Sequence, residues 1–217
     1  MIRIAVCASV LSIFVSSAQA QSIESLRFAS DLGLSQALHG ARSIGKSARG
    51  VPAISAKAVI DDRVDHAKFL LSELQKTTQV CYSKDIIGRL KELTKTHPYS
   101  DALQRLIVAG LFEDLKRVDN SEYGLFVIAT LADIASWSQY PVQDLVLRGI
   151  VMDVVRVDRM PYSLKALAVL TRVAAKSPSE DVKETAISLL QGEIRRVGQP
   201  CYSEKLLVLI DKIRKSR

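Results

Sequence analysis

The chain of 217 residues has few of the side chains from which metal and redox sites are built. It holds three histidines and three cysteines, and His39, His66 and His97 stand far apart without Cys, Asp or Glu at ligand spacing. Because a metal site needs several such ligands close together, the spacing predicts none. A phosphate-binding loop, a nucleophile elbow, a zincin motif and a dinucleotide fingerprint are also missing from the sequence. We therefore expect no catalytic residues and no cofactor.

Long apolar runs and two-residue alternation are missing as well. After residue 20, no unbroken apolar stretch reaches the roughly 20 residues that a membrane-spanning helix needs, so we expect no membrane span. No segment alternates apolar and polar residues with a period of two, which argues against β-sheet. The net charge is +7, but the basic excess follows Tyr202 and does not form a stripe along the chain. This distribution, together with the export signal described next, argues against nucleic acid as a partner.

The first 20 residues have the pattern of a secretory signal peptide. Arg3 precedes the apolar stretch Ile4–Val15, and Ala18 and Ala20 form an A-x-A cleavage site. We expect the mature chain to begin at Gln21 and to be secreted or periplasmic. Residues 21–60 predict a short N-terminal helix and a glycine-broken basic linker, which either caps the first repeat or is mobile.

The main pattern is an internal repeat. An acid, an arginine three residues later and a tyrosine nine residues after the acid recur about every 40 residues. The copies are Asp114, Arg117 and Tyr123; Asp153, Arg156 and Tyr162; and Glu193, Arg196 and Tyr202, preceded by a degenerate copy with Glu73, Lys76 and Tyr82. Such a period is typical of a stacked helical solenoid, so residues 61–217 are expected to form one all-α repeat domain.

The apolar periodicity places helices in pairs. The expected ranges are 83–96 with 99–118, 124–137 with 142–157, 163–176 with 180–197, and a last helix at 203–215, after a first apolar stripe from Val64 to Leu74. Pro98, Pro141 and Pro178 open the second helix of each pair, where proline is tolerated.

Two further features mark the starts of the first helices. We expect helix N-caps at Ser83, Ser163 and Ser203, with Gly124 in the same place. The tyrosine before each is expected to pack on the apolar residue five positions later: Tyr82 on Ile87, Tyr123 on Ile128, Tyr162 on Leu167 and Tyr202 on Leu207.

The segment Ser177–Leu190, preceded by the apolar run Ala166–Leu170, resembles a HEAT repeat of the armadillo-type solenoid family. Pro178, Asp181 and the pair Val182-Lys183 stand where that family has its turn proline, its aspartate and a Val-Arg pair. The other repeats match in part, because the segments after Asp101 and Asp144 lack the basic residue. The resemblance implies a right-handed α-solenoid of antiparallel helix pairs used for protein binding.

Cys81 and Cys201 each precede a repeat tyrosine, three repeats apart. With helix layers about 8 to 10 Å apart, their separation is roughly 25 to 30 Å, well beyond the reach of about 7 Å between the Cα atoms of a disulfide. We expect two free, buried or half-buried thiols, with an intermolecular bridge as the alternative.

Two groups of residues are candidates for binding a partner. The acid and arginine of each copy share a helix face and predict a local ion pair, and stacked repeats would also align Arg117, Arg156 and Arg196 in a row that can bind acidic groups. Trp137 and Tyr140 flank one turn and have the composition of a recognition hot spot. For both groups a purely structural role is the favoured interpretation, and partner binding is the alternative.

These patterns favour an exported, non-catalytic scaffold or interaction module whose partner is another protein. An enzyme or enzyme subunit with a groove lined by Glu73, Asp114, Asp153 and Glu193 is the alternative. It requires an acid that is buried in a cleft without its basic neighbour. An inhibitor or immunity-like binder is a third interpretation.

Overall fold

The computed structural model describes residues 56–216 except Asp119, with side chains from residue 62 onward. The predictions for the signal peptide, for residues 21–55 and for His39 lie outside the described residues. Within them the chain is all-helical, as expected, and comprises eight helices. These are α2 (Ala56–Lys76), α3 (Val80–Lys95), α4 (Asp101–Arg117), α5 (Ser121–Trp137), α6 (Tyr140–Val157), α7 (Met160–Lys176), α8 (Glu180–Val197) and α9 (Pro200–Arg214). Residues 56–60, expected in the linker, therefore belong to α2.

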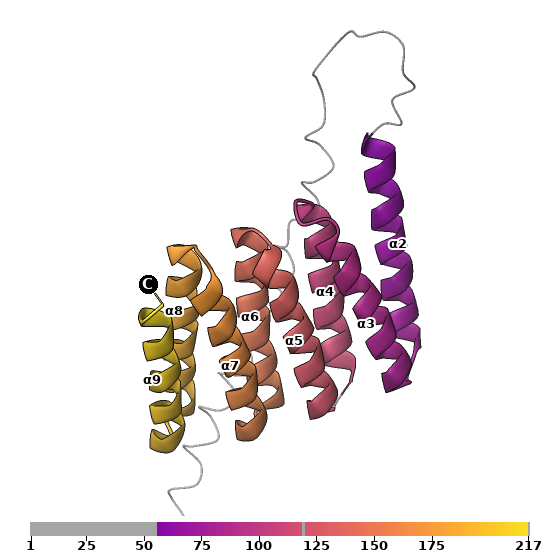
Figure 1. Cartoon of the computed structure of the whole chain (residues 1–217). Coiled ribbons are helices and arrows are strands. Elements are labelled where there is room, and N and C mark those ends of the chain that lie inside the picture. Colours follow the sequence, from indigo (N-terminus) through magenta and orange to yellow (C-terminus); the bar gives the residue numbers. More distant parts are fainter. Residues whose placement is uncertain (1–55, 119, 217) are drawn as a thin grey trace, which may run out of the picture. The chain divides into compact units, whose positions relative to one another are not determined.

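The helices form two layers (Figure 1). One layer contains α2, α4, α6 and α8, and the other contains α3, α5, α7 and α9. Each helix packs on its sequence neighbours and on the next helix of its own layer, and in the described part of the chain α2 and α3 make no contact with α8 or α9. The stack therefore follows the order of the sequence and does not close on itself.

A continuous apolar core lies between the two layers. Leucine, isoleucine and valine recur at helical spacing, so each helix buries one stripe of its surface. Leu111, Ile150 and Leu190, at equivalent places of α4, α6 and α8, are all fully buried.

Glycines let helices of the same layer approach closely. A Cβ atom on Gly110 of α4 would lie 2.4 Å from the side chain of Leu71, and one on Gly149 of α6 would lie 2.2 Å from the ring of Phe112. Each large side chain thus occupies the space that a side chain on the next helix would need.

The first helices begin earlier than predicted. The helices α3, α5, α7 and α9 each start three residues before the expected Ser83, Gly124, Ser163 and Ser203. The side chain of Asn120 caps α5 by accepting bonds from the backbone N–H groups of Glu122 and Tyr123. Proline stands at the start of α7 and α9, where its missing N–H costs nothing. The predicted N-caps were therefore wrong, because they lie within the first turn of each helix.

Candidate functional site

A buried carboxylate lies at the centre of each full repeat copy. Asp114, Asp153 and Glu193 are 0, 5 and 2% exposed. The arginine three residues later binds each acid at 2.7 Å, which confirms the predicted local pairs. The hydroxyl of the tyrosine nine residues after the acid donates to the same carboxylate. We call each such group an acid–tyrosine–arginine cluster.

The arginine of each cluster also bonds to the preceding repeat. Nη2 of Arg117 donates to the carbonyl oxygen of Leu74 at 3.0 Å, and Nη2 of Arg156 donates to that of Leu115 at 3.0 Å. These bonds join α4 to α2 and α6 to α4 near the ends of the helices. Because the guanidinium has several donors in a fixed plane, one arginine can hold its own acid and the next helix together.

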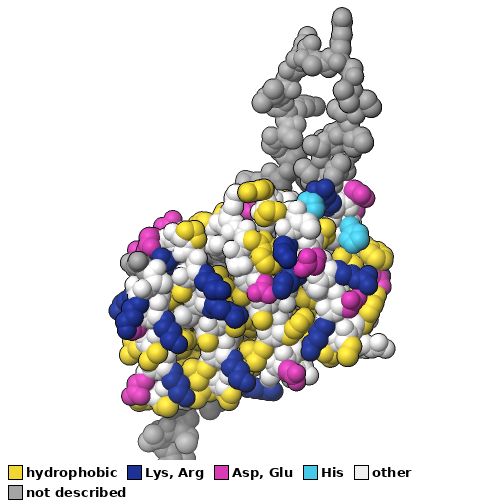
Figure 2. All heavy atoms as spheres, in the orientation of Figure 1, with side chains coloured by type: hydrophobic (Ala, Val, Ile, Leu, Met, Phe, Trp, Pro, Cys, Tyr) yellow, Lys and Arg dark blue, Asp and Glu magenta, His cyan; other side chains and the backbone are white. Residues whose placement is uncertain are grey.

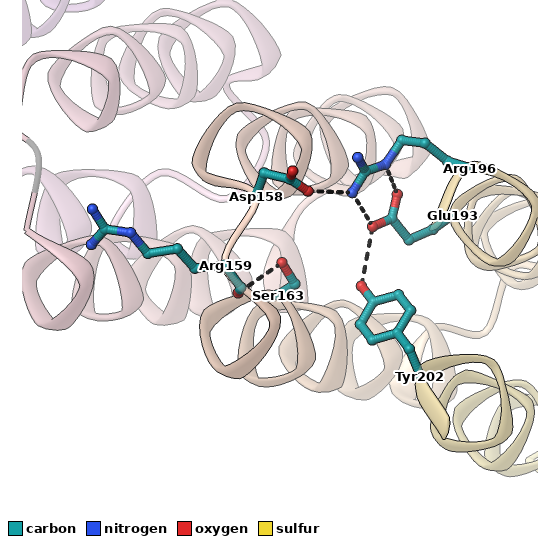
Figure 3. Close-up of polar contacts among 6 residues, drawn as sticks. All are labelled: Asp158, Arg159, Ser163, Glu193, Arg196 and Tyr202. Carbon is teal, nitrogen blue, oxygen red and sulfur yellow. Dashed lines mark hydrogen bonds and ion pairs between the residues drawn. The ribbon is translucent and has the colours of Figure 1, made fainter. Parts of the chain in front are cut away.

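The third cluster differs in its geometry (Figure 3). Glu193 is one methylene longer than aspartate, and Arg196 binds both of its oxygens, at 2.7 and 2.8 Å. Nη2 of Arg196 reaches the carboxylate of Asp158, 3.1 Å away at the end of α6. Asp158 has a φ of 46°, a left-handed conformation that aspartate tolerates better than most residues. Tyr202 approaches Glu193 from the opposite side, at 3.1 Å.

The tyrosines of the clusters are held in their protonated form. Burial raises the pKa of Tyr123 and Tyr162, and the hydrogen bonds to Asp114 and Asp153 raise it further. Burial also raises the pKa of Tyr202, followed by the negative charge of Glu193. The hydrogen bond to Glu193 raises the pKa of Arg196. Each cluster therefore contains one neutral hydroxyl donor, one carboxylate and one guanidinium.

The predicted packing of the tyrosines was wrong. Tyr123, Tyr162 and Tyr202 lie inside their helices and direct their hydroxyl groups to the acids. In the degenerate copy Tyr82 is 46% exposed, and Lys76 pairs with Glu73 at the surface. Leu207, the expected contact of Tyr202, is 56% exposed. The repeated offset of nine residues was the signal that an acid and a tyrosine meet.

The polar groups of each cluster are bonded to one another. Both oxygens of Asp114 and of Asp153 accept bonds from the chain, and both oxygens of Glu193 bind Arg196. The side chains of Arg117, Arg156 and Arg196 remain 31, 35 and 31% exposed. Their described contacts link repeats, and binding of a partner by this row stays a prediction.

Trp137 and Tyr140 lie at either side of the connection between α5 and α6. Trp137 packs partly buried against the core, and its indole N–H has no acceptor within the described part of the chain, whereas Tyr140 is 42% exposed. The two rings therefore differ in their availability to a partner.

A second set of buried polar residues was missed by the sequence analysis. Nε2 of Gln143 donates to the carbonyl oxygens of Ala135 and Ser138, and its oxygen accepts from Ser177 of the next repeat at 2.9 Å. Nε2 of Gln104, the equivalent residue of α4, likewise donates to the carbonyl oxygen of Pro98 at 2.9 Å. Lys183, the third equivalent residue, is buried and bonds to Glu180 and to the carbonyl of Ser216. Their spacing of 39 and 40 residues, the same as that of the tyrosines, could have revealed them.

Cys81 and Cys201 are free, which confirms that they do not bridge each other, but both are exposed, so the expectation of burial was wrong. They lie at the exposed starts of α3 and α9.

Among residues 62–216, no group of three or more His, Cys, Asp or Glu side chains is arranged to hold a metal ion. No described helix is both long enough and apolar enough to cross a bilayer.

Comparison of the chain with protein-family models and with curated protein sequences finds no match.

Proposed function

We propose that this chain is an exported, non-catalytic helical-repeat protein that serves as an interaction or scaffold module for another protein. Its helices form a right-handed α-solenoid of antiparallel pairs with a period of about 40 residues, of the HEAT and armadillo type. A stack of this kind offers broad outer faces on which a partner can bind.

The observation that carries the proposal is the internal pairing of the repeated acids. An enzyme groove built from Glu73, Asp114, Asp153 and Glu193 requires at least one acid without its basic neighbour. Each of the four is instead bound by the lysine or arginine three residues later. Arg117 and Arg156 also bond to a carbonyl of the preceding repeat, so the described contacts of these residues serve the packing of the stack.

The cavity beside the second cluster gives the enzyme alternative little support. It has a volume of about 10 Å³, room for about one water molecule. Its described lining residues include no acid: Val118, Asn120, Ser121, Gly124, Arg156, Val157 and Tyr162. An inhibitor or immunity-like protein would share the same scaffold and differ only in its partner.

Affinity capture from the native compartment tests the proposal. The intact chain is the bait, and a variant unfolded by Asp153→Leu, verified by circular dichroism, controls for capture by exposed apolar surface. We expect a protein that co-purifies in stoichiometric amount with the folded bait alone and is recovered unchanged in mass. The proposal is rejected if no protein is retained, or if the captured protein is chemically altered by the bait.

Export is tested by the mass of the chain recovered from the culture medium or the periplasm. We expect an N-terminus at Gln21, because small residues at Ala18 and Ala20 satisfy the signal peptidase. A chain that begins at Met1 in that compartment would contradict export through this signal.

A further inference from the structure

Two equivalent positions on the outer face of the layer formed by α3, α5, α7 and α9 change their charge along the stack. The first position lies three residues after the repeat tyrosine and holds Asp85, Phe126, Lys165 and Lys205 on the four helices in turn. The second position lies ten residues after the tyrosine and holds Glu92, Asp133, Arg172 and Lys212. Both positions are therefore acidic or neutral on α3 and α5 and basic on α7 and α9. Lys165, Arg172, Lys205 and Lys212 are all exposed.

These four cations have no acidic partner among the described residues. The helix α7 contains no Asp or Glu in its 17 residues. On α9, Asp211 pairs with Lys215 at 2.6 Å, and Glu204 is the other acid of that helix. On α5, by contrast, Asp133 binds Lys91 of α3 at 2.6 Å. Figure 2 shows lysine and arginine side chains gathered over α7 and α9, with few acids between them.

A strip of small apolar side chains separates the two basic positions. Ala168 and Val208, six residues after the repeat tyrosine, are both exposed and lie between the cations of their helices. The cations on one helix are seven residues apart, a rise of about 10 Å, which is close to the diameter of an α-helix with its side chains. The strip is therefore wide enough for one helical segment that crosses α7 and α9.

We propose that the outer face of α7 and α9 binds an acidic, amphipathic segment of a partner protein. Its apolar side chains cover Ala168 and Val208. Its carboxylates pair with Lys165 and Lys205 on one side and with Arg172 and Lys212 on the other. This assignment rests on the proposed interaction function and names the chemistry of the partner.

The apolar content of the strip favours a protein over an anionic membrane. Peripheral membrane surfaces insert large side chains such as Trp, Phe and Leu between the basic residues. The strip offers Ala168 and Val208 in these places, with the exposed Leu207 next to Val208 on α9. Asp133 extends the row of Arg172 and Lys212 with negative charge, which an anionic membrane would repel. Vesicle binding is therefore a separate outcome of the test.

The test uses fluorescence anisotropy with the full chain and a labelled amphipathic peptide of Glu, Leu and Ala. The same peptide with Gln in place of Glu controls for charge, and vesicles of phosphatidylcholine with phosphatidylglycerol test the membrane outcome. The variant carries Lys165→Gln, Arg172→Gln, Lys205→Gln and Lys212→Gln. A matched control loses the same charge from the other layer through Lys68→Gln, Arg105→Gln, Lys116→Gln and Arg195→Gln.

We expect the four-site variant to bind the Glu peptide about tenfold more weakly or worse, and the control variant to bind it like the wild type. Affinity for the Glu peptide should fall with added salt, and the Gln peptide should bind weakly. Equal binding by the two variants, no binding of the Glu peptide, or preferential binding of the vesicles would each overturn the proposal. If the four-site variant still captures the native partner, the partner binds elsewhere on the chain. The binding face proposed here is then rejected, and the proposed interaction function is retained.

Discussion

At the scale of single residues, the chain stabilises three buried carboxylates by giving each one a phenol and a guanidinium. The acid and arginine could be paired from their spacing of three residues, because that spacing places both on one helix face. The repeated offset of nine residues linked the tyrosine to the acid, but the offset does not show that the two side chains touch, because a turn lies between them. Its position is set by tertiary packing of one helix on the next.

Removal of one tyrosine hydroxyl tests how much the bond between tyrosine and acid stabilises the fold. Tyr162→Phe deletes the donor to Asp153 and leaves a buried acceptor short of one partner, so we expect a loss of about 1 to 3 kcal/mol in the free energy of unfolding. Tyr140→Phe, on an exposed ring, should change it by less than about 0.5 kcal/mol. Urea denaturation measures both, and equal values for the two variants would contradict the assigned role.

The clusters also predict loss of stability at alkaline pH. Burial raises the pKa of Tyr123, Tyr162 and Tyr202 above the ordinary value of 10.0, so the folded chain holds these protons more tightly than the unfolded chain. The stabilisation is complete below pH 10 and decreases as the pH rises above it, because only the unfolded chain then releases the protons. The free energy of unfolding, measured from about pH 8 to pH 11, should therefore fall more steeply in the wild type than in Tyr162→Phe. Parallel slopes would count against protonated, buried phenols.

At the scale of the helices, the sequence predicted the ends better than the starts. The apolar periodicity gave the last residue of each helix within about one position. The starts of α3, α5, α7 and α9 were placed three residues late, because the tyrosine and the residue after it were interpreted as a boundary. The start of α8 was predicted correctly, and those of α4 and α6 within two residues. Asn120, Pro161 and Pro200 indicated the correct starts, because Asn120 is the N-cap of α5 and the two prolines stand in the first two positions of α7 and α9.

The cap on α5 gives a direct test of the corrected boundary. Asn120→Ala removes the acceptor for two backbone N–H groups, so we expect a cost of about 1 kcal/mol in the free energy of unfolding. Gln79→Ala is the matched control, because Gln79 precedes α3 without a side-chain cap bond. An unchanged free energy for Asn120→Ala would place the start of α5 elsewhere.

Close packing of α4 and α6 depends on Gly149. Gly149→Ala would bring a methyl group into the ring of Phe112, and we expect a loss of about 1 to 3 kcal/mol in the free energy of unfolding. Gly88→Ala introduces the same methyl group on α3, where nothing lies within 4 Å, and should stabilise the chain by up to about 1 kcal/mol through helix propensity. Thermal denaturation followed by circular dichroism distinguishes the two. A stabilising Gly149→Ala would contradict the close approach of these helices.

At the scale of the whole molecule, the described helices form an open stack with two unlike ends. Ile87, Ile128 and Leu167 are fully buried, whereas Leu207 at the equivalent place of α9 is 56% exposed. Among the described residues α9 packs only on α7 and α8, and Leu207 has no neighbour of the kind that buries the equivalent residues. The period of the sequence predicted a stack, and the contacts between helices show the same order.

The charge of the outer faces was harder to predict. In the sequence the basic excess follows Tyr202, and the arginines of the clusters are the residues that the repeat aligns in a row. Which residues of α7 and α9 share an exposed face depends on the rotation of each helix about its axis. That rotation follows from packing between the layers, and it brings Lys165 and Lys205 to the same surface.

The distance between Cys81 and Cys201 tests the open stack most directly. Both thiols are exposed and free, so they accept spin labels without a change to the core, and Cys7→Ser removes the third cysteine. Double electron–electron resonance should give a narrow distribution for the two backbone positions at roughly 25 to 30 Å, which is three steps of about 8 to 10 Å within one layer. A distance near 10 Å would mean that α3 and α9 lie side by side in a closed bundle, and would contradict the account.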